Sequence, residues 1–106
     1  MRREAAFIVC LLTGLAGVQA APAVGQTVNV LGCVSRGVEF GCLIIKDRRT
    51  GKTYQINAAN PPPDPAKNLV VSLKGQIFEG VDFCQQGPIL KEITWNYTRM
   101  ACRLGK

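Results

Sequence analysis

Five stretches of this chain predict β-strands, most of them because apolar and polar side chains alternate with a period of two residues. Such a period places neighbouring side chains on opposite faces of an extended backbone. The predicted strands cover residues 27–34, 43–47, 53–57, 69–78 and 89–98. Residues 43–45 are apolar on both faces, which is typical of a strand buried inside a sheet or barrel. In the last strand, one face is expected to carry Ile89, Ile93, Trp95 and Tyr97.

One sequence pattern occurs twice. Each copy reads V-x-Φ-x-G-x-Φ-x-x-G-V-acid-F, where Φ is apolar, and a cysteine follows; the copies start at Val28 and Val71. Gly32 and Gly75 fall on the apolar side of the alternation. An inward glycine lets a strand bend sharply or pack closely, which helps a sheet to close. The repeat therefore favours a small barrel over a flat sheet.

Turn-forming residues separate the predicted strands. The segment after Asp47 predicts a hairpin turn, in which Gly51 supplies a positive φ angle and Asp47 bonds back to the turn backbone. Four prolines within residues 60–65 exclude a strand there, because proline has no amide hydrogen to donate. This segment is expected to cross the domain in an extended form. Asp64 and Pro65 predict one short helical turn at its end.

The order of these elements is that of a five-stranded OB-fold barrel, which has a longer connection between the third and fourth strands. An SH3-like barrel and a two-sheet sandwich are the alternative topologies. Three groups of residues carry a resemblance to a known family: Val-x-Val-x-Gly-Cys-Val from Val28, Leu-Ile-Ile-x-Asp-x-x-Thr-Gly-Lys-x-Tyr over residues 43–54, and Val-x-Leu-x-Gly from Val71. Through them, residues 27–102 resemble small exported bacterial proteins with an OB-like domain. The resemblance implies a fold and export, and it carries over no activity.

Residues 1–20 have the three parts of a secretory signal peptide. A start with two arginines precedes an uncharged apolar run at 5–18, and Ala20 and Ala23 offer two cleavage sites. The run is shorter than the roughly 20 apolar residues of a membrane anchor. We therefore expect an exported protein, either periplasmic or secreted. Its expected parts are a flexible lead-in at 21–26, one domain at 27–102 and a tail at 103–106.

Four cysteines follow the signal peptide: Cys33, Cys42, Cys84 and Cys102. An even number in a short exported chain predicts two disulfides, because the compartment is oxidising and a small core gains from cross-links. No Cys-x-x-Cys spacing is present, so neither a zinc ribbon nor a redox motif is indicated. We favour Cys33–Cys42 with Cys84–Cys102, which closes each loop locally. The alternative bond Cys42–Cys84 would join the two repeat loops directly, and it remains open.

The two repeat loops are the candidate ligand-binding site. In an OB-fold, the loop between the first two strands and the loop between the last two lie at one rim and flank the binding face. An aromatic surface with hydrogen-bonding acids suits a sugar ring or a peptide. The alternative is that Phe40 and Phe83 plug the ends of the barrel while the acids cap turns. The candidate residues are Glu39, Phe40, Asp82, Phe83, Tyr54 and Trp95.

The chain contains no histidine, which removes the commonest general base, the imidazole-dependent triads and most zinc catalysis. Neither Ser35 nor Ser72 lies in a glycine elbow of the kind that exposes a nucleophile. Glu39 and Asp82 are the only carboxylate pair that the repeat brings together, and so small a domain offers little cleft for a substrate. We therefore predict a non-catalytic protein with no metal and no cofactor.

The chain is basic, with a formal net charge of +6 that becomes +5 when Arg2, Arg3 and Glu4 leave with the signal peptide. This surplus favours solubility and attracts anionic partners, although the cations do not form one run. Nucleic acid would need a basic groove with aromatic platforms, and export makes that target scarce. The leading hypothesis is a binding module of the cell envelope for a glycan, a peptide or a protein. The alternative is an accessory or inhibitor-like protein that docks on an exported enzyme.

Overall fold

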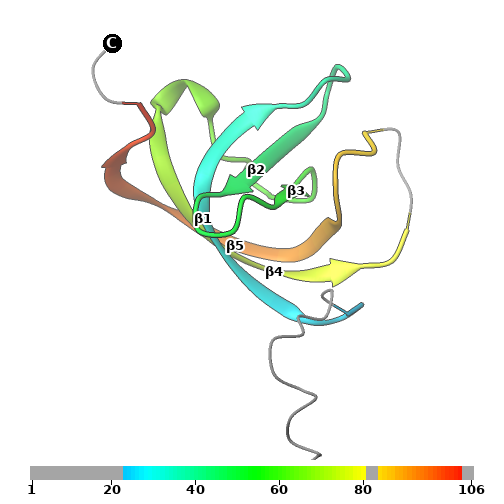
Figure 1. The fold of residues 1–106 in the computed structure, drawn as a ribbon. Coiled ribbons are helices and arrows are strands. Elements are labelled where there is room, and N and C mark those ends of the chain that lie inside the picture. Colours follow the sequence, from blue (N-terminus) through cyan, green and yellow to red (C-terminus); the bar gives the residue numbers. More distant parts are fainter. Residues whose placement is uncertain (1–22, 81–83, 104–106) are drawn as a thin grey trace, which may run out of the picture.

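The structure, a computed structural model, describes residues 23–80 and 84–103. These residues form five β-strands and one short 3₁₀ helix, so the all-β prediction is confirmed (Figure 1). In chain order the elements are β1 (Thr27–Arg36), β2 (Leu43–Asp47), β3 (Thr53–Gln55), η1 (Pro65–Lys67), β4 (Leu69–Phe78) and β5 (Ile89–Ala101). The predicted signal peptide at 1–20 lies outside the described residues, as does the tail beyond residue 103.

The five strands pair in the order β1-β2-β3-β5-β4, and β4 pairs back with β1. The pairs are antiparallel except β3 with β5, which meet in parallel at Gln55 and Ile89. The circuit of pairings is therefore closed. Closure gives each strand a neighbour at both edges, so backbone groups that an open sheet would expose are paired.

Gly32 is the position at which β1 passes from one partner to the other. The first part of β1 pairs with β4 and the second part with β2, and Gly32 belongs to both ladders, opposite Val71 and Asp47. A Cβ atom at Gly32 would lie 1.8 Å from the carbonyl oxygen of Lys46. At Gly75, the equivalent glycine of the repeat, the nearest atom to a Cβ would be 3.2 Å away. The expected close packing at the inward glycines is confirmed, and it is tightest at Gly32.

The hydrophobic core is made by side chains from all five strands and from the chain just after β3. Its buried members include Val30, Ile45, Tyr54, Ile56, Val71, Leu73 and Leu90. Removing such apolar surface from water is the main favourable term in folding. Tyr54 is 5% exposed, so its ring belongs to the core and is not free for a ligand, contrary to the prediction. Burial raises the pKa of the Tyr54 hydroxyl, and the negative charge of Asp47 raises it further.

Because β5 contains a bulge, the alternation of apolar and polar residues does not identify Leu90 as a core residue. Ile93 and Trp95 are half-buried, as the alternation predicts, but Leu90 is fully buried. Glu92 adopts a φ angle of 53°, and the register against β4 shifts beside it. Because a bulge adds one residue to a strand, it changes which positions face the core. A strict period of two therefore fails across Glu92.

Residues 23–26 form a hydrogen-bonded turn where the sequence predicts a flexible lead-in. The amide nitrogen of Gly25 donates to the carbonyl oxygen of Ile77 at 2.7 Å, and the Ile77 amide donates to the Gln26 carbonyl at 3.0 Å. These bonds continue the pairing of β1 with β4 to the start of the described chain. Residues 21 and 22 lie outside the described residues.

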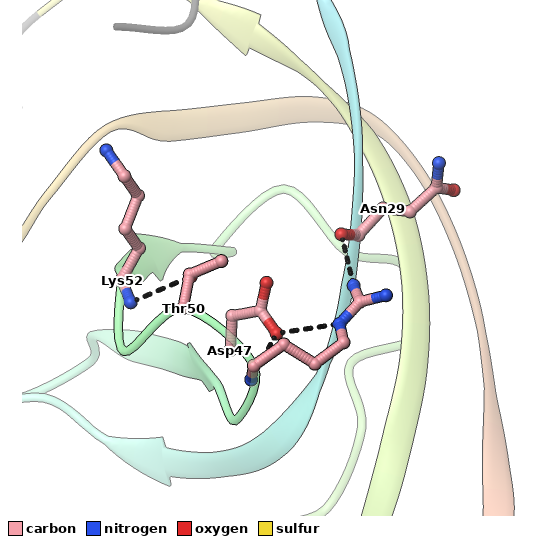
Figure 2. Close-up of polar contacts among 5 residues, drawn as sticks. Asn29, Asp47, Thr50 and Lys52 are labelled. Atoms are coloured by element: carbon pink, nitrogen blue, oxygen red, sulfur yellow. Dashed lines mark hydrogen bonds and ion pairs between the residues drawn. The ribbon is translucent and has the colours of Figure 1, made fainter. Parts of the chain in front are cut away.

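Asp47 organises the turn between β2 and β3, as the sequence predicts (Figure 2). Asp47 is 4% exposed, and its Oδ1 accepts hydrogen bonds from the Arg49 amide at 3.1 Å and from Arg49 Nε at 3.3 Å. Arg49 Nη2 donates to the carbonyl oxygen of Asn29 at 2.9 Å, which ties the turn to β1. Burial alone would raise the pKa of Asp47. The amide and guanidinium of Arg49, with the backbone of Leu31, nevertheless hold this pKa below its ordinary value.

Replacing Asp47 by asparagine should destabilise the protein most at neutral pH. A carboxyl group whose pKa is lowered by folding stabilises the fold above its unfolded pKa, and this contribution is lost as pH falls through the folded pKa. We expect Asp47→Asn to lower the free energy of unfolding by about 1–3 kcal/mol at pH 7. The difference should shrink below about pH 4, where Asp47 of the unfolded chain begins to take up its proton, and should continue to shrink as pH falls through the lower pKa of the folded protein.

Urea unfolding of the wild type and Asp47→Asn at pH 7 and pH 3 measures this effect. Asp64→Asn is the control, because asparagine caps a helical turn as well as aspartate does. An equal difference between wild type and Asp47→Asn at both pH values would contradict the expected role of the Asp47 charge.

Candidate functional site

Two disulfides join parts of the chain that are distant in sequence. Cys42 pairs with Cys84, and Cys33 pairs with Cys102, each at a Cα–Cα distance of 5.9 Å. The favoured local pairing is therefore wrong, and the alternative bond between the repeat loops is confirmed. The strand pairing explains this outcome. Near the Cys33–Cys102 bond, β4 pairs with β1 on one side and with the end of β5 on the other, so these two cysteines approach each other across the closed sheet.

The Cys42–Cys84 bond holds two loops together: the β1–β2 loop (residues 37–42) and the β4–β5 loop (residues 79–88). A hydrogen bond adds a second tie, since Gln86 Oε1 accepts from the amide nitrogen of Val38 at 2.7 Å. Figure 1 shows the described parts of both loops, 37–42 on one hand and 79–80 with 84–88 on the other, on the same side of the molecule. The two repeat loops therefore lie side by side, as the sequence predicts.

Asn57 anchors the joined loops to the chain that follows β3. Its Oδ1 accepts a hydrogen bond from the Leu43 amide at 2.7 Å, at the end of the β1–β2 loop. Its Nδ2 donates to Cys84 Sγ at 3.3 Å, at the disulfide itself. One side chain thus contacts both loops at their base, which limits their movement relative to the sheet.

Gln55 secures the end of the β4–β5 loop from inside the protein. It is 2% exposed; its amide donates to the Pro88 carbonyl at 2.9 Å, and its Nε2 donates to the Gly87 carbonyl. Gly87 has a φ angle of 116°, and a Cβ atom there would lie 2.2 Å from the Thr53 carbonyl oxygen, so this close approach requires glycine. Gln55 Oε1 has no hydrogen-bond partner among the described residues, and one buried water would satisfy it.

Phe40 stands at the corner of the β1–β2 loop. The amide of Cys42 donates to the Glu39 carbonyl at 3.1 Å, and Gly41 has a φ angle of 87°. These features close a four-residue turn with glycine at its third position and Phe40 at its second. Phe40 is 99% exposed, and Val38 is 84% exposed. The alternative in which Phe40 plugs the barrel is therefore wrong.

A cleft of about 390 Å³ lies between the base of the β1–β2 loop and the proline-rich crossover. Its apolar lining includes Leu43, Ala59, Pro62, Pro63 and Pro65. Arg36 and Asp64 supply its charged groups. The side chain of Arg36 makes no hydrogen bond or ion pair with any other described residue, so its guanidinium is free for a ligand. Arg36 also borders a second hollow of about 440 Å³, which Glu39 and Phe40 line.

Trp95 and Tyr97 hold the crossover that lines this cleft. Trp95 Nε1 donates to the carbonyl oxygen of Pro61 at 2.8 Å, and the Tyr97 hydroxyl accepts from the Asp64 amide at 2.8 Å. The two rings meet edge to face with their centroids 4.8 Å apart. Asp64 in turn caps η1 through its Oδ1, which accepts from the Ala66 amide at 2.9 Å, so the predicted helical turn is confirmed. Trp95 therefore supports the backbone, whereas the sequence suggested a ligand contact.

The structure divides the six candidate residues into three groups. Glu39 and Phe40 lie together on the exposed β1–β2 loop. Asp82 and Phe83 fall outside the described residues. Tyr54 and Trp95 have structural roles: Tyr54 lies in the core, and Trp95 is hydrogen-bonded to the crossover. Among the described candidates, only Glu39 and Phe40 are therefore exposed for a ligand.

Three polar residues belong to this site and escaped the sequence analysis: Arg36, Asn57 and Gln86. Arg36 ends β1, and Asn57 and Gln86 lie in connecting segments, where polar residues are ordinary. Asn57 and Gln86 act through hydrogen bonds to residues 14 and 48 positions away along the chain, and Arg36 acts through its place in the lining of the cleft. The one local feature that these three residues share is a place at the end of a strand or in a connecting segment. This feature is too common to identify them from the sequence.

The described residues hold no group of three or more histidine, cysteine, aspartate and glutamate side chains that could bind a metal ion. Within 23–80 and 84–103 there is also no apolar helix of membrane-spanning length. The site thus offers an exposed aromatic ring, a nearby carboxylate and a free guanidinium. The chain matches no family model, no curated protein and no solved structure.

Proposed function

We propose that this protein is an exported, non-catalytic binding module that docks on a protein of the cell envelope through Phe40. The observation that carries the proposal is the 99% exposure of Phe40 on a loop held by a disulfide and a hydrogen bond. Leaving such a side chain in water forgoes about 1.5–3 kcal/mol of burial free energy. An apolar pocket on a partner recovers this free energy when the ring enters it.

The fixed base of the β1–β2 loop supports the same proposal. A flexible loop loses conformational entropy when it binds, and prior ordering removes that cost. Cys42 is bonded to the neighbouring loop, and Val38 is hydrogen-bonded to it. Arg36 and Glu39, which both precede Phe40 in the chain and line the same hollow, supply charged contacts for the rim of such an interface.

The OB-fold and export are part of the proposal. The strand order β1-β2-β3-β5-β4 and the η1 turn between β3 and β4 support an OB-fold barrel. The leader-like residues 1–20 and the two disulfides support export to an oxidising compartment.

The alternative hypothesis is an accessory or inhibitor-like protein that docks on an exported enzyme, and the backbone of the β1–β2 loop argues against docking as an added strand. An extended segment that binds as an added strand offers its amides and carbonyls to the partner. Here the Cys42 amide is already bonded to the Glu39 carbonyl, and the Gly37 amide is bonded to the Cys42 carbonyl. The loop therefore exposes the Phe40 side chain to a partner, while several of its backbone amides and carbonyls are already hydrogen-bonded within the protein.

The cleft beside the loop supports a second candidate function, the binding of a glycan or a short peptide. Its volume of about 390 Å³ lies in the range of small-ligand sites. Prolines provide apolar walls, while Arg36 and Asp64 provide a donor and an acceptor. In this case the ligand would depend on Arg36 and not on Phe40.

Replacing Phe40 by alanine should strongly weaken partner binding without loss of stability. We expect an unchanged melting temperature, because the ring makes almost no contact with the rest of the protein, and an affinity at least about tenfold lower, as for an interface hot spot. Val24→Ala is the matched control, since Val24 is an exposed apolar residue outside the site, at 60% exposure.

The partner can be identified with a photo-crosslinking phenylalanine analogue at position 40, incubated with envelope extract. The affinity of the crosslinked protein is then measured for the wild type, Phe40→Ala, Val24→Ala and Arg36→Gln. Equal affinity of wild type and Phe40→Ala would contradict the proposal. Loss of glycan or peptide binding in Arg36→Gln alone would favour the second candidate.

A further inference from the structure

The turn between β2 and β3 concentrates positive charge at the opposite end of β2 from the β1–β2 loop. Residues 46–52 contain four cations and one acid: Lys46, Arg48, Arg49 and Lys52 with Asp47. Asp47 is buried, and its charge is engaged with Arg49. The acid therefore does not neutralise the three other cations.

These three cations are exposed and have no acidic partner within the described part of the chain. Lys46, Arg48 and Lys52 are all exposed to solvent. The side chain of Arg48 makes one polar contact, from Nη1 to the sulfur of Met100 at 3.7 Å. The Lys52 ammonium extends away from Asp47 in Figure 2. The charge of this turn is thus available to a ligand.

A fourth cation is brought to the turn by the disulfide at β1. Cys33 lies opposite Lys46 in the β1–β2 ladder, and Cys33 is bonded to Cys102, which directly precedes the exposed Arg103. We call Lys46, Arg48, Lys52 and Arg103 the basic surface. The other acids of the described chain lie outside the turn, at Glu39, Asp64, Glu79 and Glu92.

The backbone under the basic surface is firmly held. Arg49 bonds to Asp47 and to the carbonyl of Asn29, and the Lys52 amide donates to Thr50 Oγ1 at 3.1 Å (Figure 2). The turn is therefore tied both to itself and to β1. The cations project from a fixed base, which reduces the entropy lost when a ligand orders them.

We propose that the basic surface binds ligands that carry several closely spaced phosphate groups. Arginine matches the geometry of a phosphate with two parallel hydrogen bonds, and lysine adds compact point charges. A chain of phosphates also releases its bound counterions when such cations neutralise it, which favours binding. The surface is separate from Phe40, so this inference does not depend on the proposed protein partner.

The test compares two double variants that remove equal charge. Arg48→Gln/Lys52→Gln alters the basic surface, and neither side chain takes part in the bonds that hold the turn. Lys74→Gln/Lys91→Gln is the control, because both are exposed cations outside the turn, in β4 and in β5. Inorganic polyphosphate is the soluble probe, and vesicles of phosphatidylcholine with phosphatidylglycerol are the membrane probe. Melting curves verify that all proteins are folded.

We expect the wild type to bind at low ionic strength, with an affinity that falls as salt is added. The turn variant should bind at least about tenfold more weakly, and the control within about threefold of the wild type. If the turn variant loses binding to polyphosphate but not to vesicles, the ligand of the basic surface is a soluble phosphate chain. If it loses binding to both probes, the basic surface binds lipid headgroups as well. No binding to either probe at low salt, or an equal loss in both variants, would overturn the proposal.

Discussion

Replacing Gly32 by alanine should unfold this protein or leave it barely folded. The new Cβ would lie 1.8 Å from the Lys46 carbonyl oxygen, which is backbone and cannot rotate away. Relief requires β1 and β2 to separate at the residue where β1 also pairs with β4. We expect a loss of at least about 3 kcal/mol, the upper end for overpacking. For a domain with about 5–15 kcal/mol of total stability, such a loss is a large fraction.

Gly75→Ala is the matched control, because Gly75 occupies the equivalent place in the repeat. Its nearest neighbours to a new Cβ are the Leu90 and Ile93 side chains and the Lys91 carbonyl, at 3.2–3.3 Å. Side chains can shift by a few tenths of an ångström, so we expect a loss of about 1 kcal/mol. Guanidinium unfolding of both variants measures the difference. Equal stability of the two variants would contradict the role of Gly32 as the tightest point of the closed sheet.

Removing the Cys33–Cys102 disulfide should produce the second large loss of stability. The bond joins residues 69 apart, and the chain-entropy model gives about 4 kcal/mol for a loop of this length. It is the bond that fastens the end of the chain to β1. Cys33→Ala/Cys102→Ala should therefore unfold at much lower denaturant concentration, and mass spectrometry would verify that the Cys42–Cys84 bond is retained. An unfolding midpoint that matches the wild type would contradict this expectation.

Cys42→Ala/Cys84→Ala separates stability from binding. This bond joins residues 42 apart, so the same model again gives about 4 kcal/mol. Of the two disulfides, only this one joins the β1–β2 loop to the β4–β5 loop, where it acts together with the hydrogen bond between Val38 and Gln86. Both double variants should lose stability, but at a temperature where both are folded only Cys42→Ala/Cys84→Ala should lose affinity for the partner of Phe40. Equal affinity of the two variants would argue that the loop does not need its disulfide to bind.

The two proposed surfaces lie at opposite ends of β2 and differ in chemistry. The β1–β2 loop presents an exposed aromatic ring beside Glu39. The β2–β3 turn presents cations on a base ordered by Asp47. A small closed sheet can therefore hold a protein partner at one end and a phosphate-bearing ligand at the other, without the two competing for the same residues.

The sequence by itself determined the features that depend on neighbouring residues. β2 and β4 begin and end at the predicted residues, whereas β1 and β5 run further and β3 ends earlier, at Gln55. The turn at Asp47, the cap at Asp64 and the inward glycines also followed from local pattern. Alternation, capping and turn chemistry act over a few residues, so they can be identified along the chain.

Only the tertiary structure decided which distant residues meet. Cys33 finds Cys102 because β4 pairs with both β1 and β5, and no spacing along the chain reveals that contact. Tyr54 and Phe40 are both aromatic residues in the candidate site of the sequence, yet the first is 5% exposed and the second 99%. Burial and disulfide pairing are set by distances across the closed sheet. Those distances arise only when all five strands have paired.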